Sequence, residues 1–238
     1  MNGKFIGTGT MGSVKKANTS ILIDNILFDC GMGTIKQLEK LGNRVKDLDY
    51  VVISHFHADH FFDLPNLIIG KKIRKELDKK IYIVGPTGIK QKTYDMMILS
   101  FGDLGSLEDY ANIEFIELEP NTKFNFNEYT LTTYELKHGN ATPNFGYLLE
   151  KENKVIGYTG DSTLCDNFYK MCEKANYMIV DTCMQNESNP AHIGLSDLLA
   201  ITDNYMNCKF YSVHRSDYEV PNTDKVLFPN DGDTFDIN

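Results

Sequence analysis

The chain has 238 residues, 42% hydrophobic and 24% charged, so it can bury a sizeable core and is expected to be globular. Its net charge of -9 argues against general affinity for nucleic acid and other polyanions. No apolar run approaches a membrane span, and the first residues lack the apolar stretch of a signal peptide, so a cytoplasmic protein without membrane contact is expected.

The first half of the chain predicts strands that alternate with helices. Apolar runs predict strands at residues 4–7, 20–23, 26–29, 50–53 and 81–84. Asp24-Asn25 is typical of a tight hairpin turn between the second and third of these strands. Helical patterns end near Leu41, before Gly42, and continue at residues 61–77 and 87–99.

The second half begins with short alternating runs, which predict an antiparallel sheet. Its strands are expected at residues 113–118, 123–126, 130–136 and 145–150. Later strands are predicted at residues 155–158, 177–180 and 209–213, and helices at 166–174 and 195–205. No linker divides the chain, so a single domain over residues 1–238 is expected. The order of elements favours an α/β fold in which two sheets lie face to face with helices outside, a four-layer αββα sandwich.

One motif stands out at residues 54–60, Ser-His-Phe-His-Ala-Asp-His, directly after a buried apolar run. Residues i and i+2 of an extended chain point the same way, so His55 and His57 can converge on one metal ion. Asp59 and His60 follow where the chain turns, and they can face a second ion. Imidazole and carboxylate suit zinc, and other first-row metals less selectively, so the motif predicts a metal site.

Further candidate ligands lie just beyond three other predicted strands. His138 follows the strand at 130–136, and Asp161 and His214 follow the strands that end at residues 158 and 213. Side chains in such positions can converge at one rim of a sheet. The remaining histidine, His192, lies in a polar loop, so all 6 histidines of the chain fall at strand ends or in that loop.

The motif resembles the signature of the metallo-β-lactamase superfamily, and other stretches resemble its ribonuclease Z-like branch. These stretches are Gly7–Thr10, Phe28–Thr34, Val84–Gly88, Phe145–Tyr147 and Tyr158–Ser162. The resemblance implies one zinc ion held by His55, His57 and His138, and a second held by Asp59, His60 and His214, with Asp161 bridging both. Two Zn²⁺ ions, or Mn²⁺ in their place, would share a water and convert it to hydroxide at neutral pH.

Asp59 and His192 are the candidate catalytic residues. In the branch that this chain resembles, a histidine placed like His192 is taken to protonate the departing alkoxide, and an imidazole near neutral pH suits that task. A solvated loop histidine is the ordinary alternative for His192.

The same resemblance bears on the substrate. Ribonuclease Z carries a protruding arm that grips transfer RNA, inserted between the positions that match His138 and Asp161. Only residues 139–160 stand there, and predicted strands fill them, so we expect no arm. Armless relatives are similar to small-molecule phosphodiesterases, including the anti-Pycsar family of cyclic-nucleotide hydrolases. The expected activity is hydrolysis of a small phosphodiester, such as a 3′,5′-cyclic nucleotide, by a homodimer.

Three alternatives stay open. A transfer-RNA 3′-processing endonuclease would need a basic surface, and residues 71–80, with six basic side chains, are a candidate. The ordinary interpretation of that basic segment is a solvated helix face. A lactone or thioester hydrolase would not need His192 as a general acid. A regulatory metal-binding protein is less expected, because inactive relatives usually lose ligands that this chain retains.

The five cysteines, none spaced as CxxC, are expected to be reduced thiols.

Overall fold

The computed structural model describes residues 1–237, and its first sheet has seven strands. These are β1 (Asn2–Gly7), β2 (Ser20–Ile23), β3 (Ile26–Phe28), β4 (Tyr50–Val52), β5 (Ile81–Pro86), β6 (Ile113–Leu118) and β14 (Thr234–Asp236). Their spatial order is β14-β1-β2-β3-β4-β5-β6, and β3 to β6 are parallel. The helices of this half are α1 (Thr34–Lys40), α2 (Ala58–Phe61), α3 (Leu64–Ile73), α4 (Ile89–Phe101) and α5 (Leu107–Ala111).

The second sheet also has seven strands. These are β7 (Lys123–Phe126), β8 (Tyr129–Glu135), β9 (Phe145–Lys151), β10 (Lys154–Tyr158), β11 (Tyr177–Asp181), β12 (Lys209–Val213) and β13 (Val226–Leu227). They lie in the order β13-β12-β11-β10-β9-β8-β7, antiparallel from β7 to β10 and parallel from β10 to β13. The helices α6 (Asp166–Cys172) and α7 (Leu195–Ile201) belong to this half.

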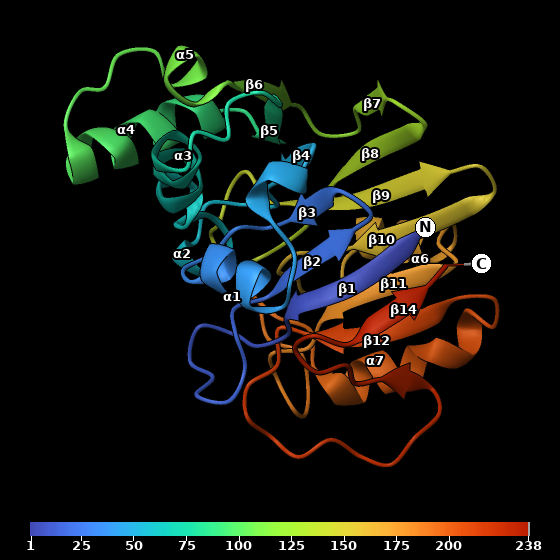
Figure 1. Cartoon of the computed structure of the whole chain (residues 1–238). Coiled ribbons are helices and arrows are strands. Elements are labelled where there is room, and N and C mark those ends of the chain that lie inside the picture. The colour runs from blue at the N-terminus through green and yellow to red at the C-terminus, as the bar shows by residue number, and fades with distance from the viewer. Residues whose placement is uncertain (238) are drawn as a thin grey trace.

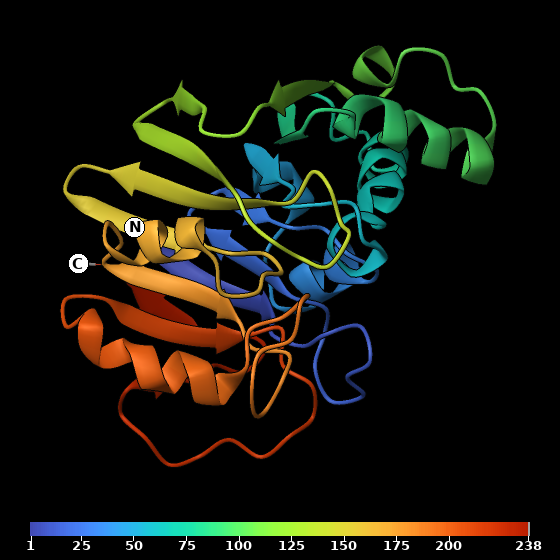
Figure 2. The same cartoon turned by 180° about the vertical axis from the view of Figure 1, so that it is seen from behind.

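Three apolar layers join these elements into a sandwich (Figures 1 and 2). Side chains alternate along β2, so Ile21 and Ile23 pack between the sheets while Leu22 packs under the helices of the first half. On the other side, Phe168 of α6 and Leu198 of α7 pack on the outer face of the second sheet. Both sheets are therefore covered on both faces, and the predicted αββα fold is confirmed.

One strand was assigned to the wrong sheet by the sequence pattern. Residues 113–118 were expected in the antiparallel sheet, but β6 pairs parallel with β5, with Ile113 opposite Ile81. The reason is the connection, because a parallel pair needs a crossover and α4 with α5 provides one. The helix α5 and the short strands β13 and β14 were not predicted, since segments of two to five residues carry little periodicity.

Two predicted helices are also shorter in the structure. The helix expected at 61–77 is α3, which begins only at Leu64 and ends at Ile73, with Pro65 in its first turn, and the separate short helix α2 ends at Phe61. The helix expected at 195–205 ends at Ile201 and continues as a 3₁₀ turn, Thr202–Asn204. Asn238, the last residue of the predicted domain, lies outside the described residues. Among residues 1–237, no helix has the length and apolar character needed to cross a bilayer.

Candidate metal centre

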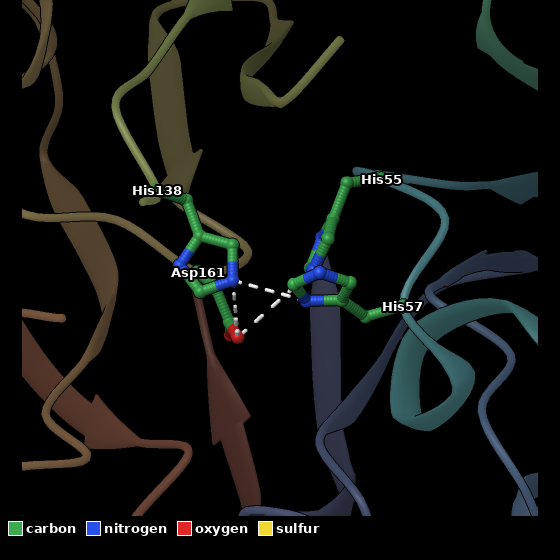
Figure 3. A group of neighbouring side chains, drawn as sticks. All are labelled: His55, His57, His138 and Asp161. Carbon is green, nitrogen blue, oxygen red and sulfur yellow. Dashed lines mark hydrogen bonds and ion pairs between the residues drawn. The ribbon is translucent and has the colours of Figure 1, made fainter. Parts of the chain in front are cut away.

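The histidine motif leaves the carboxyl end of β4 as extended chain and then turns into the short helix α2. The rings of His55 and His57 lie with their centroids 4.6 Å apart, so the alternate residues do face one space, as Figure 3 shows. The turn brings the backbone of Asp59 against Gly31, where a Cβ atom would lie only 1.7 Å from the Asp59 carbonyl oxygen. A glycine is therefore required at position 31 for the turn to take this place.

Three other loops bring further donors to the same rim. His138 follows β8, Asp161 follows β10 and His214 follows β12, and all three side chains are buried. Nε2 of His138 lies 3.0 Å from Nδ1 of His57 and 3.6 Å from Asp161 Oδ2 (Figure 3). The strand-end rule thus brings together residues that lie more than 150 positions apart in the chain, such as Asp59 and His214, whose side chains are 3.2 Å apart.

The donors form two groups whose ligand atoms all lie within 4.8 Å of one another. The first group consists of His55, His57, His138 and Asp161, and the second consists of Asp59, His60, Asp161 and His214. Asp161 belongs to both groups. The structure therefore assembles the seven predicted ligands in two overlapping sets, and their binding of metal remains a prediction.

A buried carboxylate that was not predicted, Asp29, orients the first part of the motif. Its Oδ2 accepts hydrogen bonds from the Tyr158 hydroxyl at 2.6 Å and the Ser54 hydroxyl at 2.8 Å, and lies 2.7 Å from His60 Nδ1. The Ser54 hydroxyl in turn lies 3.0 Å from His55 Nδ1. With Nδ1 engaged in this way, both histidines direct Nε2 into the donor groups, a typical arrangement behind metal-binding histidines.

A second buried carboxylate, Asp181, serves the other side of the site. Its Oδ2 lies 2.8 Å from His192 Nδ1, and its Oδ1 lies 3.3 Å from His214 Nδ1. Backbone N–H groups of Ser162 and Cys183 donate to the same carboxylate at 3.0 and 2.8 Å. Asp29 and Asp181 each stand at the carboxyl end of a strand, so the rule that pointed to Asp161 could have found them.

His192, predicted as a catalytic residue, reaches this rim from its loop. Its ring stacks on that of His214 at 5.4 Å between centroids and meets the His138 ring edge-on at 4.8 Å. Burial disfavours its charged form, but the hydrogen bond and charge of Asp181 outweigh burial and raise the pKa of His192.

Comparison with known proteins identifies the family. The model of the family described as Anti-Pycsar protein Apyc1 matches residues 1–229. The chain belongs to this family. Ribonuclease Z of Staphylococcus carnosus is 30% identical to it over 154 residues, covering 61% of this chain and 48% of that protein. Ribonuclease Z of Picrophilus torridus is 33% identical over 161 residues, covering 63% and 48%. The chain spans about half the length of these curated relatives.

Solved structures place the Apyc1-family chain in the metallo-β-lactamase fold. The metallo-beta-lactamase fold protein YhfI from Bacillus subtilis superposes with a TM-score of 0.79 at 18% identity, covering 98% of each chain. The short form of human tRNase Z gives a TM-score of 0.79 at 22% identity, covering 100% of both chains. The predicted membership of the metallo-β-lactamase superfamily and its ribonuclease Z-like branch is thereby confirmed.

Electrostatics divide the histidines of this Apyc1-family site into two kinds. Burial lowers the pKa of His55 and His57, so both are neutral and ready to donate a lone pair at neutral pH. Burial also disfavours charge on His60, but Asp161 and Asp29 outweigh it and raise the pKa of His60 to about 10. His214 is raised in the same way against its burial, mainly by Asp161. In the metal-free protein, protonated His60 and His214 therefore supply positive charge next to Asp161, where a metal ion would bind.

Buried atoms without a partner test whether a metal fits. His55 Nε2, His60 Nε2 and Asp161 Oδ1 are all buried and make no hydrogen bond within the described residues. His60 Nε2 and Asp161 Oδ1 are 3.1 Å apart, but they are not aligned as a hydrogen bond. Leaving buried polar atoms unsatisfied costs about 1–3 kcal/mol each, so this arrangement indicates a missing ligand. Two divalent cations with nitrogen and oxygen preference, one at each donor group, would satisfy these atoms.

The donors open into a cavity of about 530 Å³. The donor residues His57, Asp59, His138, Asp161, His192 and His214 line it together with residues of the loops at Thr10–Met11 and Gly139–Ala141. Among the described residues that line the cavity there is no lysine or arginine. The cavity size is typical of a small-molecule site.

Proposed function

We propose that this protein is a dinuclear metal-dependent phosphodiesterase that hydrolyses a small phosphodiester, a 3′,5′-cyclic nucleotide. The observation that carries the proposal is the pair of donor groups that share Asp161, with buried atoms that lack a hydrogen-bond partner in the described part of the chain. Relatives named as ribonuclease Z, and a structural neighbour named as a diphosphatase from the PhnP family, support a metal-dependent hydrolase.

The ligand assignment follows the two groups. His55, His57 and His138 would hold one ion, Asp59, His60 and His214 would hold the other, and Asp161 would contact both. Nitrogen and oxygen donors suit Zn²⁺, with Mn²⁺ as the alternative. When bound, two such ions supply a nucleophile at neutral pH and neutralise negative charge on the phosphate.

The chain itself supplies orientation and a proton. Asp29 fixes the ring of His60, and Asp181 fixes those of His192 and His214. Because Nδ1 of His192 faces Asp181, Nε2 is the nitrogen free to donate a proton. The raised pKa of His192 keeps that proton in place at neutral pH, so the imidazolium can protonate the departing alkoxide.

The lining of the cavity supports a small substrate with one negative charge. Without lysine or arginine there, nothing in the described lining would hold the additional phosphates of a polynucleotide. Residues 139–160 form a loop and the β9–β10 hairpin, and no arm protrudes from them. A cyclic nucleotide presents one phosphodiester and fits the volume of the cavity.

Transfer-RNA 3′ processing is the second candidate function. It is favoured by identities of 30 to 33% to proteins named ribonuclease Z. The acidic net charge of -9 stands against it, since RNA binding depends on neutralising phosphates.

A substrate panel tests the proposal. Protein loaded with Zn²⁺ or Mn²⁺ is offered bis-p-nitrophenyl phosphate, purine and pyrimidine 3′,5′-cyclic nucleotides, a precursor transfer RNA and a lactone. We expect cleavage of a cyclic nucleotide that is lost in His57→Ala and retained in Lys80→Gln, a matched surface variant. Cleavage of the precursor at its 3′ end would favour the second candidate. Lactone turnover alone would overturn the phosphodiesterase.

The homodimer implied by the family resemblance is part of the proposal. Light scattering across a range of protein concentrations measures the assembly directly. A monomer at every concentration would remove the dimer and leave the proposed chemistry unaffected.

A further inference from the structure

A thiol lies beside the two donor groups without belonging to either. Cys183 follows β11 by two residues, and its Sγ atom and one ring nitrogen each of His192 and His214 all lie within 4.8 Å of one another. Cys183 is partly exposed, whereas His214 is buried. His192 and His214 have roles in the proposed hydrolysis, but the sulfur of Cys183 has none.

The backbone around Cys183 is fixed. Its N–H group donates to Asp181 Oδ1 at 2.8 Å, and its carbonyl oxygen accepts a hydrogen bond from the Ser216 hydroxyl at 2.8 Å. His192 is held by Asp181 in turn. These hydrogen bonds hold the backbone of Cys183 and the ring of His192 in place, so the fold itself brings the thiol close to the two imidazoles.

The chemistry of the cluster selects a class of ligand. One sulfur and two imidazole nitrogens form a set that Zn²⁺ and other thiophilic cations prefer over harder cations such as Mg²⁺ or Mn²⁺. The donors of one tetrahedral zinc ion lie roughly 3.5 Å apart, given Zn–S near 2.3 Å and Zn–N near 2.0 Å. Donors within 4.8 Å reach that spacing through small side-chain adjustments.

We propose that Cys183, His192 and His214 bind a thiophilic divalent cation when it is in excess over the two ions of the hydrolytic site. On binding, the thiol releases its proton to solvent and the thiolate donates an electron pair to the cation, with no change of oxidation state. The site would therefore respond to Zn²⁺ or Cd²⁺ and not to Mn²⁺.

Occupancy of this site competes with the proposed hydrolysis. A His192 ring that donates a lone pair to the cation cannot also be doubly protonated, so the imidazolium proposed to protonate the leaving group is lost. His214 faces Asp59 with Nε2 and Asp181 with Nδ1, so a neutral ring has only one lone pair for either cation. Excess Zn²⁺ is therefore expected to inhibit the enzyme, and excess Mn²⁺ is not.

Cadmium reports the thiolate directly. Wild-type protein preloaded with Mn²⁺ is titrated with Cd²⁺ while the ultraviolet S→Cd²⁺ charge-transfer band is followed. We expect a saturable band in wild type, no band in Cys183→Ser, and an unchanged band in Cys165→Ser, a partly buried thiol that belongs to no donor cluster among residues 1–237. Melting temperatures of the variants confirm folding, and Cys183→Ala repeats the test if the serine variant fails.

The outcomes separate this site from the proposed activity. No band in wild type at excess Cd²⁺, or a band that survives in Cys183→Ser, overturns the site whatever the enzyme hydrolyses. The inhibition is measured with bis-p-nitrophenyl phosphate, where Cys183→Ser is expected to need about tenfold more Zn²⁺ for half-inhibition, a typical loss when a metal site is weakened. If wild type shows the Cd²⁺ band but Zn²⁺ inhibits wild type and Cys183→Ser equally, the proposed competition with hydrolysis is wrong.

Discussion

Two regions of this molecule concentrate charged and titratable side chains, and they differ in how those groups are satisfied. At the rim of the sandwich, His55, His60 and Asp161 are buried, and each keeps an atom without a hydrogen-bond partner among residues 1–237. In the basic segment, residues 71–80, most cations have a partner in the fold. Lys80 Nζ lies 2.9 Å from Glu114 and Lys79 Nζ lies 2.7 Å from Asp49.

The basic segment also lies at the wrong end of the sheet to steer a substrate. It leads into the amino end of β5, whereas the donors gather where β4, β8, β10 and β12 end. Lys71 is fully buried, and its Nζ atom donates to the carbonyl oxygens of Glu76 and Lys79, both at 2.9 Å. The structure differs from the solvated helix face that was the ordinary interpretation, because the helix ends at Ile73 and most cations of the segment have partners in the fold. Charges with local partners report on stability, and buried donors without partners report on a missing ligand.

Among the substitutions considered, Asp161→Asn is expected to have the largest effect. If both donor groups depend on this carboxylate, Asp161→Asn should leave the protein folded but reduce bound metal below the wild-type content. Loss of the charge stabilisation that metal ions supply, several kcal/mol, corresponds to an activity loss on the order of 1000-fold. Elemental analysis and phosphodiester turnover measure both. Wild-type metal content in the variant would contradict the shared role of Asp161.

Removing the support behind the donors should have the next largest effect. Asp29→Ala deprives His60, Ser54 and Tyr158 of their common acceptor in the core. We expect destabilisation of about 3–5 kcal/mol, typical of breaking a buried charged network, and roughly 10- to 100-fold weaker metal binding. Urea unfolding and competition with a chelating dye measure the two effects. A variant that keeps wild-type stability would show that Asp29 does not hold the rim.

The pH dependence of the stability of the metal-free protein tests whether a proton on His60 takes the place of a metal ion. The unfolded-state pKa of His60 is near its ordinary 6.5 and the folded value is about 10, so this group stabilises the fold fully below pH 6.5 and loses its contribution as pH rises towards 10. The free energy of unfolding should fall by about 2.5 kcal/mol between pH 7 and pH 9. Metal-loaded protein should not show this loss, because the ion replaces the proton. Parallel curves for both forms would exclude that exchange.

The sequence located the donors because metal ligands must converge, and the ends of neighbouring strands are where a sheet allows it. His138, Asp161 and His214 were found in this way without knowledge of their distances. The parallel pairing of β6 with β5 was missed, although the helix predicted at 87–99 lies between the two strands and is the crossover that a parallel pair needs.

The supporting residues were overlooked for a related reason. An aspartate at a strand end, such as Asp29 or Asp181, is also an ordinary turn residue, and only contacts across the sheets distinguish the two roles. Cys183 was expected to be one of five reduced thiols, and its position beside His192 and His214 depends on three separate loops. Local patterns therefore predicted which groups have donor chemistry, and the fold decided which of them meet.

The smallest expected effect tests the basic segment. Lys80→Gln removes an exposed cation whose only ionic partner among residues 1–237 is Glu114, so turnover of a phosphodiester should change by less than about twofold, at low and at physiological salt. Lys71→Ala provides the contrast within the same segment, because it removes the Nζ donor of two partly buried carbonyl oxygens and should destabilise the fold by about 1–3 kcal/mol. A salt-dependent drop in kcat/KM for Lys80→Gln would instead identify the segment as a steering surface. In that case Lys80, although paired with Glu114, would act on the substrate, and a local ionic partner would no longer distinguish cations that stabilise the fold from groups that bind a ligand.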